Sequence, residues 1–165
     1  MESHKTNMRK ALTYAEQAYK IKEVPVGAVI VNEENEVIGW GFNDRELTQD
    51  ATRHAEINAI KMATENVGSW RLENTTMYVT LEPCPMCSGA IIQSRIPRVI
   101  FGAYDFKGGC AGSVMNILEN EKFNHNPQVI GGILETECSQ ILKDFFAELR
   151  KGNNNISREI DDEVM

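Results

Sequence analysis

The spacing of apolar residues changes several times along the chain, and each change predicts a new element. Residues 3–21 carry apolar side chains at helical spacing, which predicts an amphipathic helix. Residues 26–31 and 36–40 are short apolar segments on either side of a polar Asn-Glu-Glu-Asn turn, so they predict two strands of a hairpin. Another largely apolar run with helical character begins at or just before His54.

The second half of the chain alternates strands with helices. Its predicted elements are strands at 77–81, 98–102 and 129–130 and helices through 88–93 and 135–150. This alternation predicts an α/β layered sheet, with parallel pairing after the initial hairpin. The three asparagines at 153–155 are expected to end the last helix. We therefore expect one folded domain over residues 1–150 and a disordered, acidic tail over residues 151–165.

Composition is ordinary for a small folded protein. The 165 residues are 42% hydrophobic and 25% charged, as expected for one globular domain. No apolar run approaches the roughly 20 residues of a membrane-spanning helix, and the polar N-terminus does not resemble a secretory signal. Cys110 and Cys138 stand alone in the sequence. We therefore expect no membrane partner and a reducing, cytoplasmic location.

The candidate chemistry is concentrated in two short motifs. A His-x-Glu motif contains His54 and Glu56, and a later Pro-Cys-x-x-Cys motif contains Cys84 and Cys87. One imidazole and two thiolates can bind zinc and leave the fourth tetrahedral position open, which is typical of a catalytic zinc site. Glu56 is not needed as a ligand, so it can move protons between a metal-activated water and a substrate.

The spacing within each motif predicts how the two converge. His54 and Glu56 are two positions apart, so on the side of a helix they would point roughly 200° apart. They can face one metal only if it lies beyond the helix end. Cys84 and Cys87 fit the first turn of a second helix, where a proline is tolerated. We therefore expect two helix N-termini to point at one zinc ion, where their positive dipole ends favour thiolates.

Each motif alone has simpler interpretations. A Cys-x-x-Cys pair in an intracellular protein can be a dithiol redox pair, and the same ligands can hold a structural zinc ion. A zinc-binding interaction module without enzyme activity is a further possibility. Glu56 argues against that module, because a binding protein has no use for a spare carboxylate at its metal.

Together the two motifs resemble the signature of the zinc-dependent nucleobase deaminases. Over about residues 8–150 the chain resembles one group of these enzymes, the bacterial tRNA-specific adenosine deaminases. The segments that carry this resemblance are residues 23–28, 69–72, 78–84, 94–100, 112–113 and 145–146. The resemblance implies a three-layer α/β/α fold of the cytidine deaminase type, with a central mixed five-stranded sheet and helices on both faces.

The resemblance also implies a function. Members of this family hydrolyse the wobble adenosine of a tRNA anticodon stem-loop to inosine. They act as homodimers and bind the RNA loop near the subunit interface. By position, His54, Cys84 and Cys87 would bind one Zn²⁺ per subunit, and Glu56 would be the general acid and base. The reacting base must leave its stack to enter such a pocket, which suits a single-stranded loop.

Two polar residues are expected to contact the substrate, again by resemblance. Asn43 would read a base edge with its amide, although it can also be a turn residue. Asp105 would accept a hydrogen bond from a ribose 2′-OH, which helps to distinguish RNA from DNA. A cap of a helix or turn is the other interpretation of Asp105.

Four apolar residues are expected at the same pocket. Val26 and Ala28 would wall the base pocket, although in isolation they are simply strand residues. Phe145 and Phe146 would offer a stacking face for a splayed nucleotide, but one or both fit the core equally well at this spacing.

Charge and one departure from the family, Pro85, favour an alternative substrate. The net charge of −7 argues against a protein that binds nucleic acid mainly through its phosphates. Pro85 stands where the tRNA enzymes more often carry an aliphatic residue, and related guanine deaminases also have proline there. Deamination of a free base or nucleoside, such as guanine or cytidine, therefore stays open. Arg53 is a further departure from the family pattern. It can be a phosphate contact or simply a solvated charge at the start of a helix.

Overall fold

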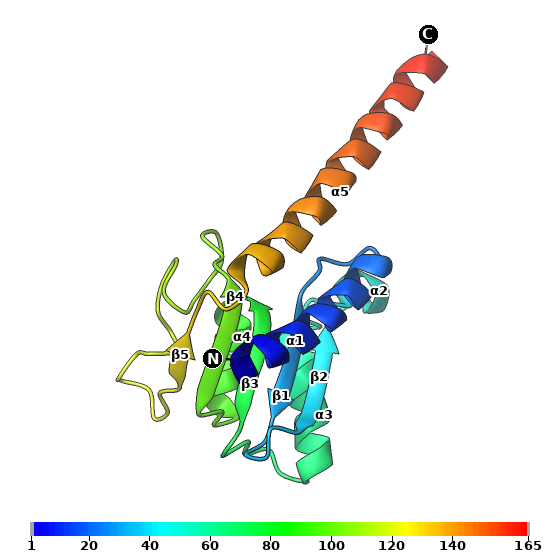
Figure 1. Cartoon of the computed structure of the whole chain (residues 1–165). Coiled ribbons are helices and arrows are strands. Elements are labelled where there is room, and N and C mark those ends of the chain that lie inside the picture. Colours follow the sequence, from blue (N-terminus) through cyan, green and yellow to red (C-terminus); the bar gives the residue numbers. More distant parts are fainter. Residues whose placement is uncertain (1, 165) are drawn as a thin grey trace.

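The computed structural model describes residues 2–164, with side chains described as far as Gly152, and Figure 1 shows a sheet with α1 lying in front of it. The helices and strands are, in chain order, α1 (Glu2–Lys20), β1 (Gly27–Val31), β2 (Val37–Phe42), α2 (Arg45–Thr48), α3 (Ala55–Val67), β3 (Thr76–Leu81), α4 (Pro85–Gln93), β4 (Arg98–Ala103), β5 (Gln128–Ile130) and α5 (Glu135–Val164).

The sheet has five strands in the order β2-β1-β3-β4-β5. β1 pairs antiparallel with both β2 and β3, whereas the pairs β3–β4 and β4–β5 are parallel. The expected mixed five-stranded α/β fold, with a hairpin followed by parallel pairing, is therefore confirmed. Two antiparallel steps separate β2 from β3, so these two strands run in the same direction and end at the same edge of the sheet.

Two apolar cores cover the two faces of the sheet. Successive side chains of a strand point to opposite faces, and β1 follows this rule. Ala28 and Ile30 pack into the core that contains α3 and α4 residues, such as Ala59 and Ile91. Val29 lies in the other core, which contains residues of α1 and α5. Helices therefore cover both faces, as a three-layer arrangement requires.

Glycines bring α3 unusually close to β2. A Cβ atom at Gly39 would collide with the carbonyl oxygen of Ala59, and one at Gly41 would collide with that of Ala55. Because both positions lack a side chain, the helix backbone lies directly on the edge strand. This contact fixes where α3 begins, and its N-terminal end carries His54.

The last helix differs from the sequence-based expectation. α5 continues through positions 153–155 to Val164, so the predicted helix end near Arg150 is wrong. Asparagine lowers helix propensity by less than about 1 kcal/mol per residue, so three of them do not force a stop. The division into a domain of residues 1–150 and an acidic tail of residues 151–165 stays a prediction. Over the part of the chain that the structure describes, no helix is both long and apolar enough to cross a membrane.

Candidate functional site

The two motifs meet at adjoining helix N-termini, as their spacing predicted. His54 is the N-cap residue of α3 and Cys84 is that of α4, and both have extended backbone. Neither side chain makes an N-cap hydrogen bond, so neither is used to close the start of its own helix. The Sγ atoms of Cys84 and Cys87 each lie 3.6 Å from Nδ1 of His54.

These separations fit a tetrahedral metal site. Zinc bonds of about 2.3 Å to sulfur and about 2.0–2.1 Å to nitrogen, at tetrahedral angles, place the two ligand atoms about 3.5 Å apart. The ligand atoms of His54, Cys84 and Cys87 all lie within 4.8 Å of one another. One nitrogen and two sulfurs are also a donor set that zinc prefers. The residues therefore form a possible metal-binding group with three ligands.

Glu56 lies next to this group in the first turn of α3, and only 4% of its surface is exposed. Burial raises the pKa of its carboxyl group to about 7. A carboxyl group that titrates near neutrality can both accept and donate a proton at physiological pH. A role of Glu56 as general acid and base is compatible with this position and pKa, and it stays a prediction.

Hydrogen bonds tune the candidate ligands as well. A hydrogen bond from the Cys87 thiol lowers the pKa of Cys84 to about 4. Hydrogen bonding to Cys84 raises the pKa of His54, while burial and the positive charge of Arg45 act in the opposite direction. Cys84 is therefore a thiolate at neutral pH, which is the form that binds metals.

A pocket of about 480 Å³ opens beside the metal-binding group. This volume lies in the usual range for small-ligand sites. Its lining residues are Lys22, Glu23, Val24, Val26, Asn43, Arg45, Glu46, His54, Glu56, Leu81, Glu82, Cys84, Asp105, Phe145, Phe146 and Leu149. The structure thus brings nearly all of the predicted site residues together. Cys87 does not line the pocket itself and belongs to the site through the metal-binding group. Ala28 is the exception, because it is fully buried in the core and neither lines the pocket nor belongs to that group.

Asn43 holds the start of α3. Its Nδ2 donates to the carbonyl oxygen of Val24 at 3.1 Å, and its Oδ1 accepts from the backbone N–H of Ala55 at 2.8 Å. Both ends of the amide therefore bond to the protein, as a turn residue would. Asn43 also lines the pocket, and its contact with a base edge stays a prediction.

Asp105 caps a turn at the pocket wall. Its Oδ1 accepts from the N–H groups of Lys107 at 3.0 Å and Gly108 at 3.1 Å. The capping interpretation therefore describes this side chain, and the contact with a ribose hydroxyl stays a prediction.

The two phenylalanines of α5 have different environments. Phe145 is 8% exposed and packs edge-on against both Tyr19 and Phe146, with ring centres 5.7 and 5.4 Å apart. Phe146 is 39% exposed at the same pocket, so it has the freer ring face. One of the pair is thus largely core and the other is available for stacking.

Glu82 is a site residue that the sequence analysis did not single out. It is 2% exposed, lines the pocket and organises the loop that contains Asp105. Its Oε1 accepts from the N–H of Asp105 at 3.1 Å and from the hydroxyl of Ser113. Its Oε2 accepts from the N–H groups of Ala111 at 3.0 Å and Ser113 at 3.1 Å. The available signal was a carboxylate directly after a buried strand and just before the Pro-Cys-x-x-Cys motif.

Comparison with known proteins identifies the family. Residues 2–150 match the family described as MafB19-like deaminase. The tRNA-specific adenosine deaminase of Bacillus subtilis is 50% identical over 144 residues, which cover 87% of this chain and 89% of that protein. The chain belongs to the tRNA-specific adenosine deaminase family. It is therefore a hydrolytic deaminase, and the interpretations as a redox pair or a non-enzymatic zinc module are set aside.

Two further family relatives agree with this assignment. The tRNA-specific adenosine deaminase of Haemophilus influenzae is 46% identical over 144 residues, which cover 87% of this chain and 83% of that protein. A solved chain from work on A-to-I editing by tRNA:A34 deaminases has a TM-score of 0.79 at 42% identity. The match covers 83% of this chain and 99% of that chain, so nearly all of the solved chain has a counterpart in this fold.

Replacing Glu82 with Gln is expected to loosen the Asp105 loop. Both oxygens of Glu82 accept from backbone N–H groups, so in either orientation the NH₂ group of glutamine would face an N–H donor and leave it without an acceptor. We expect the free energy of unfolding to fall by about 2–3 kcal/mol, measured by urea denaturation. The exposed Glu121→Gln is the matched control. Equal unfolding midpoints for Glu82→Gln and the wild type would contradict the anchoring role.

Proposed function

We propose that this enzyme hydrolyses the wobble adenosine of a tRNA anticodon loop to inosine and releases ammonia. The observation that carries the proposal is the position of Glu56, a buried carboxyl group beside three metal-ligand atoms in one pocket. The family supplies the substrate class, because its members at 46–50% identity are named tRNA-specific adenosine deaminases. The geometry supplies the chemistry.

His54, Cys84 and Cys87 would hold one zinc ion per subunit. When bound, the ion supplies a water that loses its proton near neutral pH. The dipole ends of α3 and α4 favour negative charge at this position, and the low pKa of Cys84 keeps one thiolate ready for the metal.

Glu56 moves the protons. Its carboxylate accepts a proton from the attacking water and delivers it to N1 of adenine, next to the attacked C6. In a second transfer, the carboxylate takes the proton of the new C6 hydroxyl group and delivers it to the amine. The C6–N bond then breaks, ammonia leaves, and C6 keeps the oxygen of the water as the carbonyl group of inosine. A pKa of about 7 suits both directions of transfer.

The pocket walls would hold an unstacked nucleotide. An adenine inside a base-paired stem cannot reach buried groups, whereas a base in a loop can rotate out of its stack. Val26 and Leu81 line the pocket as apolar walls. Asp105, which lines the pocket, would accept a hydrogen bond from a ribose hydroxyl, and the exposed ring of Phe146 would stack on a neighbouring base.

The acidic net charge does not favour the alternative strongly enough to displace this proposal. An enzyme that recognises one flipped base through pocket contacts needs few phosphate contacts, so a net charge of −7 is compatible with it. Deamination of free guanine or cytidine stays the competing outcome of the substrate test below.

We also propose a cytoplasmic homodimer. Three exposed apolar side chains near the Asp105 loop support a subunit contact, because apolar groups gathered on a surface commonly mark interfaces. They are Phe106, 81% exposed, Val114, 52% exposed, and Met115, 54% exposed. The tRNA substrate supports the location.

Replacing Glu56 with Ala is expected to lower kcat by at least about 10³-fold, because proton transfer in both directions is lost. Zinc content, measured by inductively coupled plasma mass spectrometry, should stay at one ion per chain. The matched control is Glu65→Ala, an exposed residue near the other end of α3, which should keep its activity. Loss of zinc from Glu56→Ala would show instead that this carboxylate is a ligand.

The substrate test uses an anticodon stem-loop with adenosine at the wobble position. We expect inosine in this RNA and no product from free adenosine, cytidine or guanine, measured by nucleoside chromatography and ammonia release. A stem-loop with the adenosine moved into the paired stem is the matched control and should be inert. Turnover of guanine or a nucleoside, with an inert stem-loop, would reject the tRNA substrate and support the alternative.

A further inference from the structure

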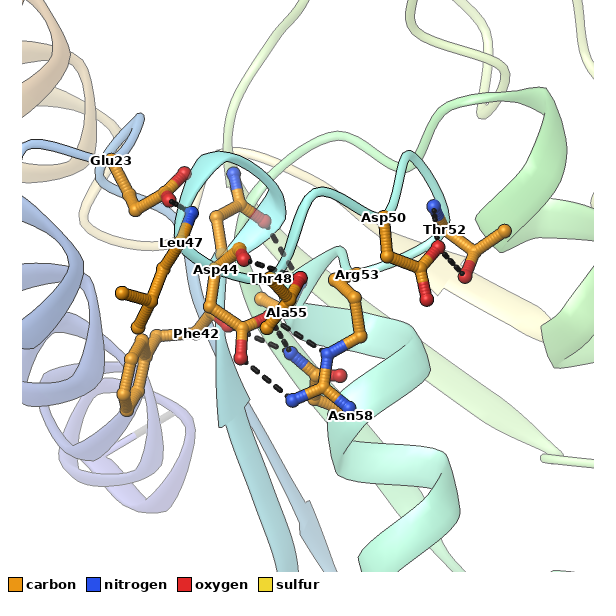
Figure 2. Close-up of polar contacts among 11 residues, drawn as sticks. Glu23, Phe42, Asp44, Leu47, Thr48, Asp50, Thr52, Arg53, Ala55 and Asn58 are labelled. Carbon is orange, nitrogen blue, oxygen red and sulfur yellow. Dashed lines mark hydrogen bonds and ion pairs between the residues drawn. The ribbon is translucent and has the colours of Figure 1, made fainter.

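Residues 44–53 form a loop between β2 and α3 whose two ends are bonded to each other, as Figure 2 shows. Arg53 donates from Nε to Oδ1 of Asp44 at 3.0 Å and from Nη2 to Oδ2 at 2.7 Å. The backbone N–H of Asp44 also donates to the carbonyl oxygen of Arg53 at 3.2 Å. We call these three bonds the Asp44–Arg53 clasp.

The clasp is tied to the two elements that flank the loop. Nδ2 of Asn58, on α3, donates to Oδ1 of Asp44 at 3.0 Å and to the carbonyl oxygen of Phe42, on β2, at 2.9 Å. The side chains of Arg53 and Asp44 are 32% and 12% exposed. A bidentate, partly buried pair of this kind is stronger than a typical surface ion pair. Lysine could not reproduce its two-pronged geometry.

The tip of the loop is held as well. The N–H of Leu47 donates to Oε1 of Glu23 at 2.7 Å, and Glu23 is a buried residue just before β1. The hydroxyl of Thr48 donates to the carbonyl oxygen of Asp44 at 2.7 Å. Hydrogen bonds at both ends of the loop and in its middle hold residues 44–53 in place. Because Arg45 and Glu46 line the pocket, we call this loop the rim of the pocket.

The rim places Arg45 at the pocket. Arg45 and Lys22 are the two cationic residues in the pocket lining, which also contains the five carboxylates of Glu23, Glu46, Glu56, Glu82 and Asp105. The side chain of Arg45 is 51% exposed, and its contact with Glu46 is long, at 3.9 Å. Its guanidinium is therefore largely available to a ligand.

We propose that Arg45 binds a phosphate of the RNA next to the reacting nucleotide, and that Asp44 and Arg53 are positioning residues that hold it there. The inference rests on the proposed function, because a polynucleotide brings a phosphodiester to the pocket. Besides Glu56, four acidic side chains line the pocket and repel a polyanion, so a guanidinium at the rim has a large local effect. The planar fork of arginine also matches two phosphate oxygens.

Direct contact between Arg53 and the RNA is the competing explanation. Arg53 already uses Nε and Nη2 to bond to Asp44, its side chain is 32% exposed against 51% for Arg45, and it does not line the pocket. Its effect on substrate binding should therefore pass through Arg45. A double variant separates the two explanations, because substitutions that act through one residue are not additive.

The test measures kcat and KM for the anticodon stem-loop with the zinc-loaded protein. We expect Arg45→Gln to raise KM by about tenfold, as loss of one charge-assisted hydrogen bond predicts. Arg53→Lys should raise KM by a smaller factor, and the double variant should be no worse than Arg45→Gln alone. In all three variants kcat should stay within about twofold, because the interaction is equally strong in ground and transition states.

The matched control is Arg71→Gln, which removes an exposed arginine beyond the other end of α3 and should leave KM unchanged. The salt dependence of kcat/KM is a second readout. A plot of log(kcat/KM) against log salt concentration should be less steep in Arg45→Gln by about 0.7, as expected for the loss of one phosphate contact to a single strand. Hydrogen exchange at the Leu47 amide should become faster in Arg53→Lys.

Three results would overturn the inference. KM could stay unchanged in Arg45→Gln, the increases in KM could multiply in the double variant, or the Leu47 amide could stay equally protected in Arg53→Lys. An inert stem-loop with the wild-type enzyme is a different failure, because it would reject the proposed function itself.

Discussion

The site depends on one constraint, that α3 and α4 begin beside each other at the same edge of the sheet, so that Nδ1 of His54 lies 3.6 Å from each Sγ of Cys84 and Cys87. β2 and β3 run in the same direction, since two antiparallel pairings with β1 separate them. A chain that leaves either strand therefore leaves at the same edge, and α3 and α4 start there on one face. His54 and Cys84 are N-cap residues, so their side chains are not committed to a helix side. Three ligand atoms can thus meet beyond the two helix ends, with Glu56 beside them in the first turn of α3.

Polar networks hold the loops around this centre in place. Glu82 accepts hydrogen bonds from three backbone N–H groups of the Asp105 loop, and the Asp44–Arg53 clasp closes the loop on the opposite side. Both networks use carboxylates that are buried or nearly so, where a missing partner is most destabilising. The ligands therefore lie on rigid helices, whereas the walls that recognise substrate lie on loops fixed by specific side chains. Such a division permits substrate recognition to vary without disturbing the chemistry.

The sequence predicted those features of the site that depend on the spacing of residues within one motif. The His-x-Glu and Cys-x-x-Cys intervals predicted two helix N-termini at one metal, because the geometry of a helix excludes other solutions. Alternation in β1 puts Ala28 on the sheet face that α3 covers. Whether a residue on that face lines the pocket or lies in the core depends on packing that the sequence does not display. The anchoring role of Glu82 and the pairing of Asp44 with Arg53 depend on which donors a fold brings near a carboxylate. The helix end expected at the asparagines was wrong because their low propensity does not terminate a helix.

The central claim is that two helices place one nitrogen and two sulfurs around a zinc ion with an open fourth position. Zinc K-edge X-ray absorption of the purified, zinc-loaded protein tests this claim most directly. We predict two sulfur ligands at about 2.3 Å and two lighter ligands, one of them an imidazole, at about 2.0–2.1 Å. A shell of four sulfur and imidazole ligands with no exchangeable oxygen, or a protein that retains no zinc, would contradict it.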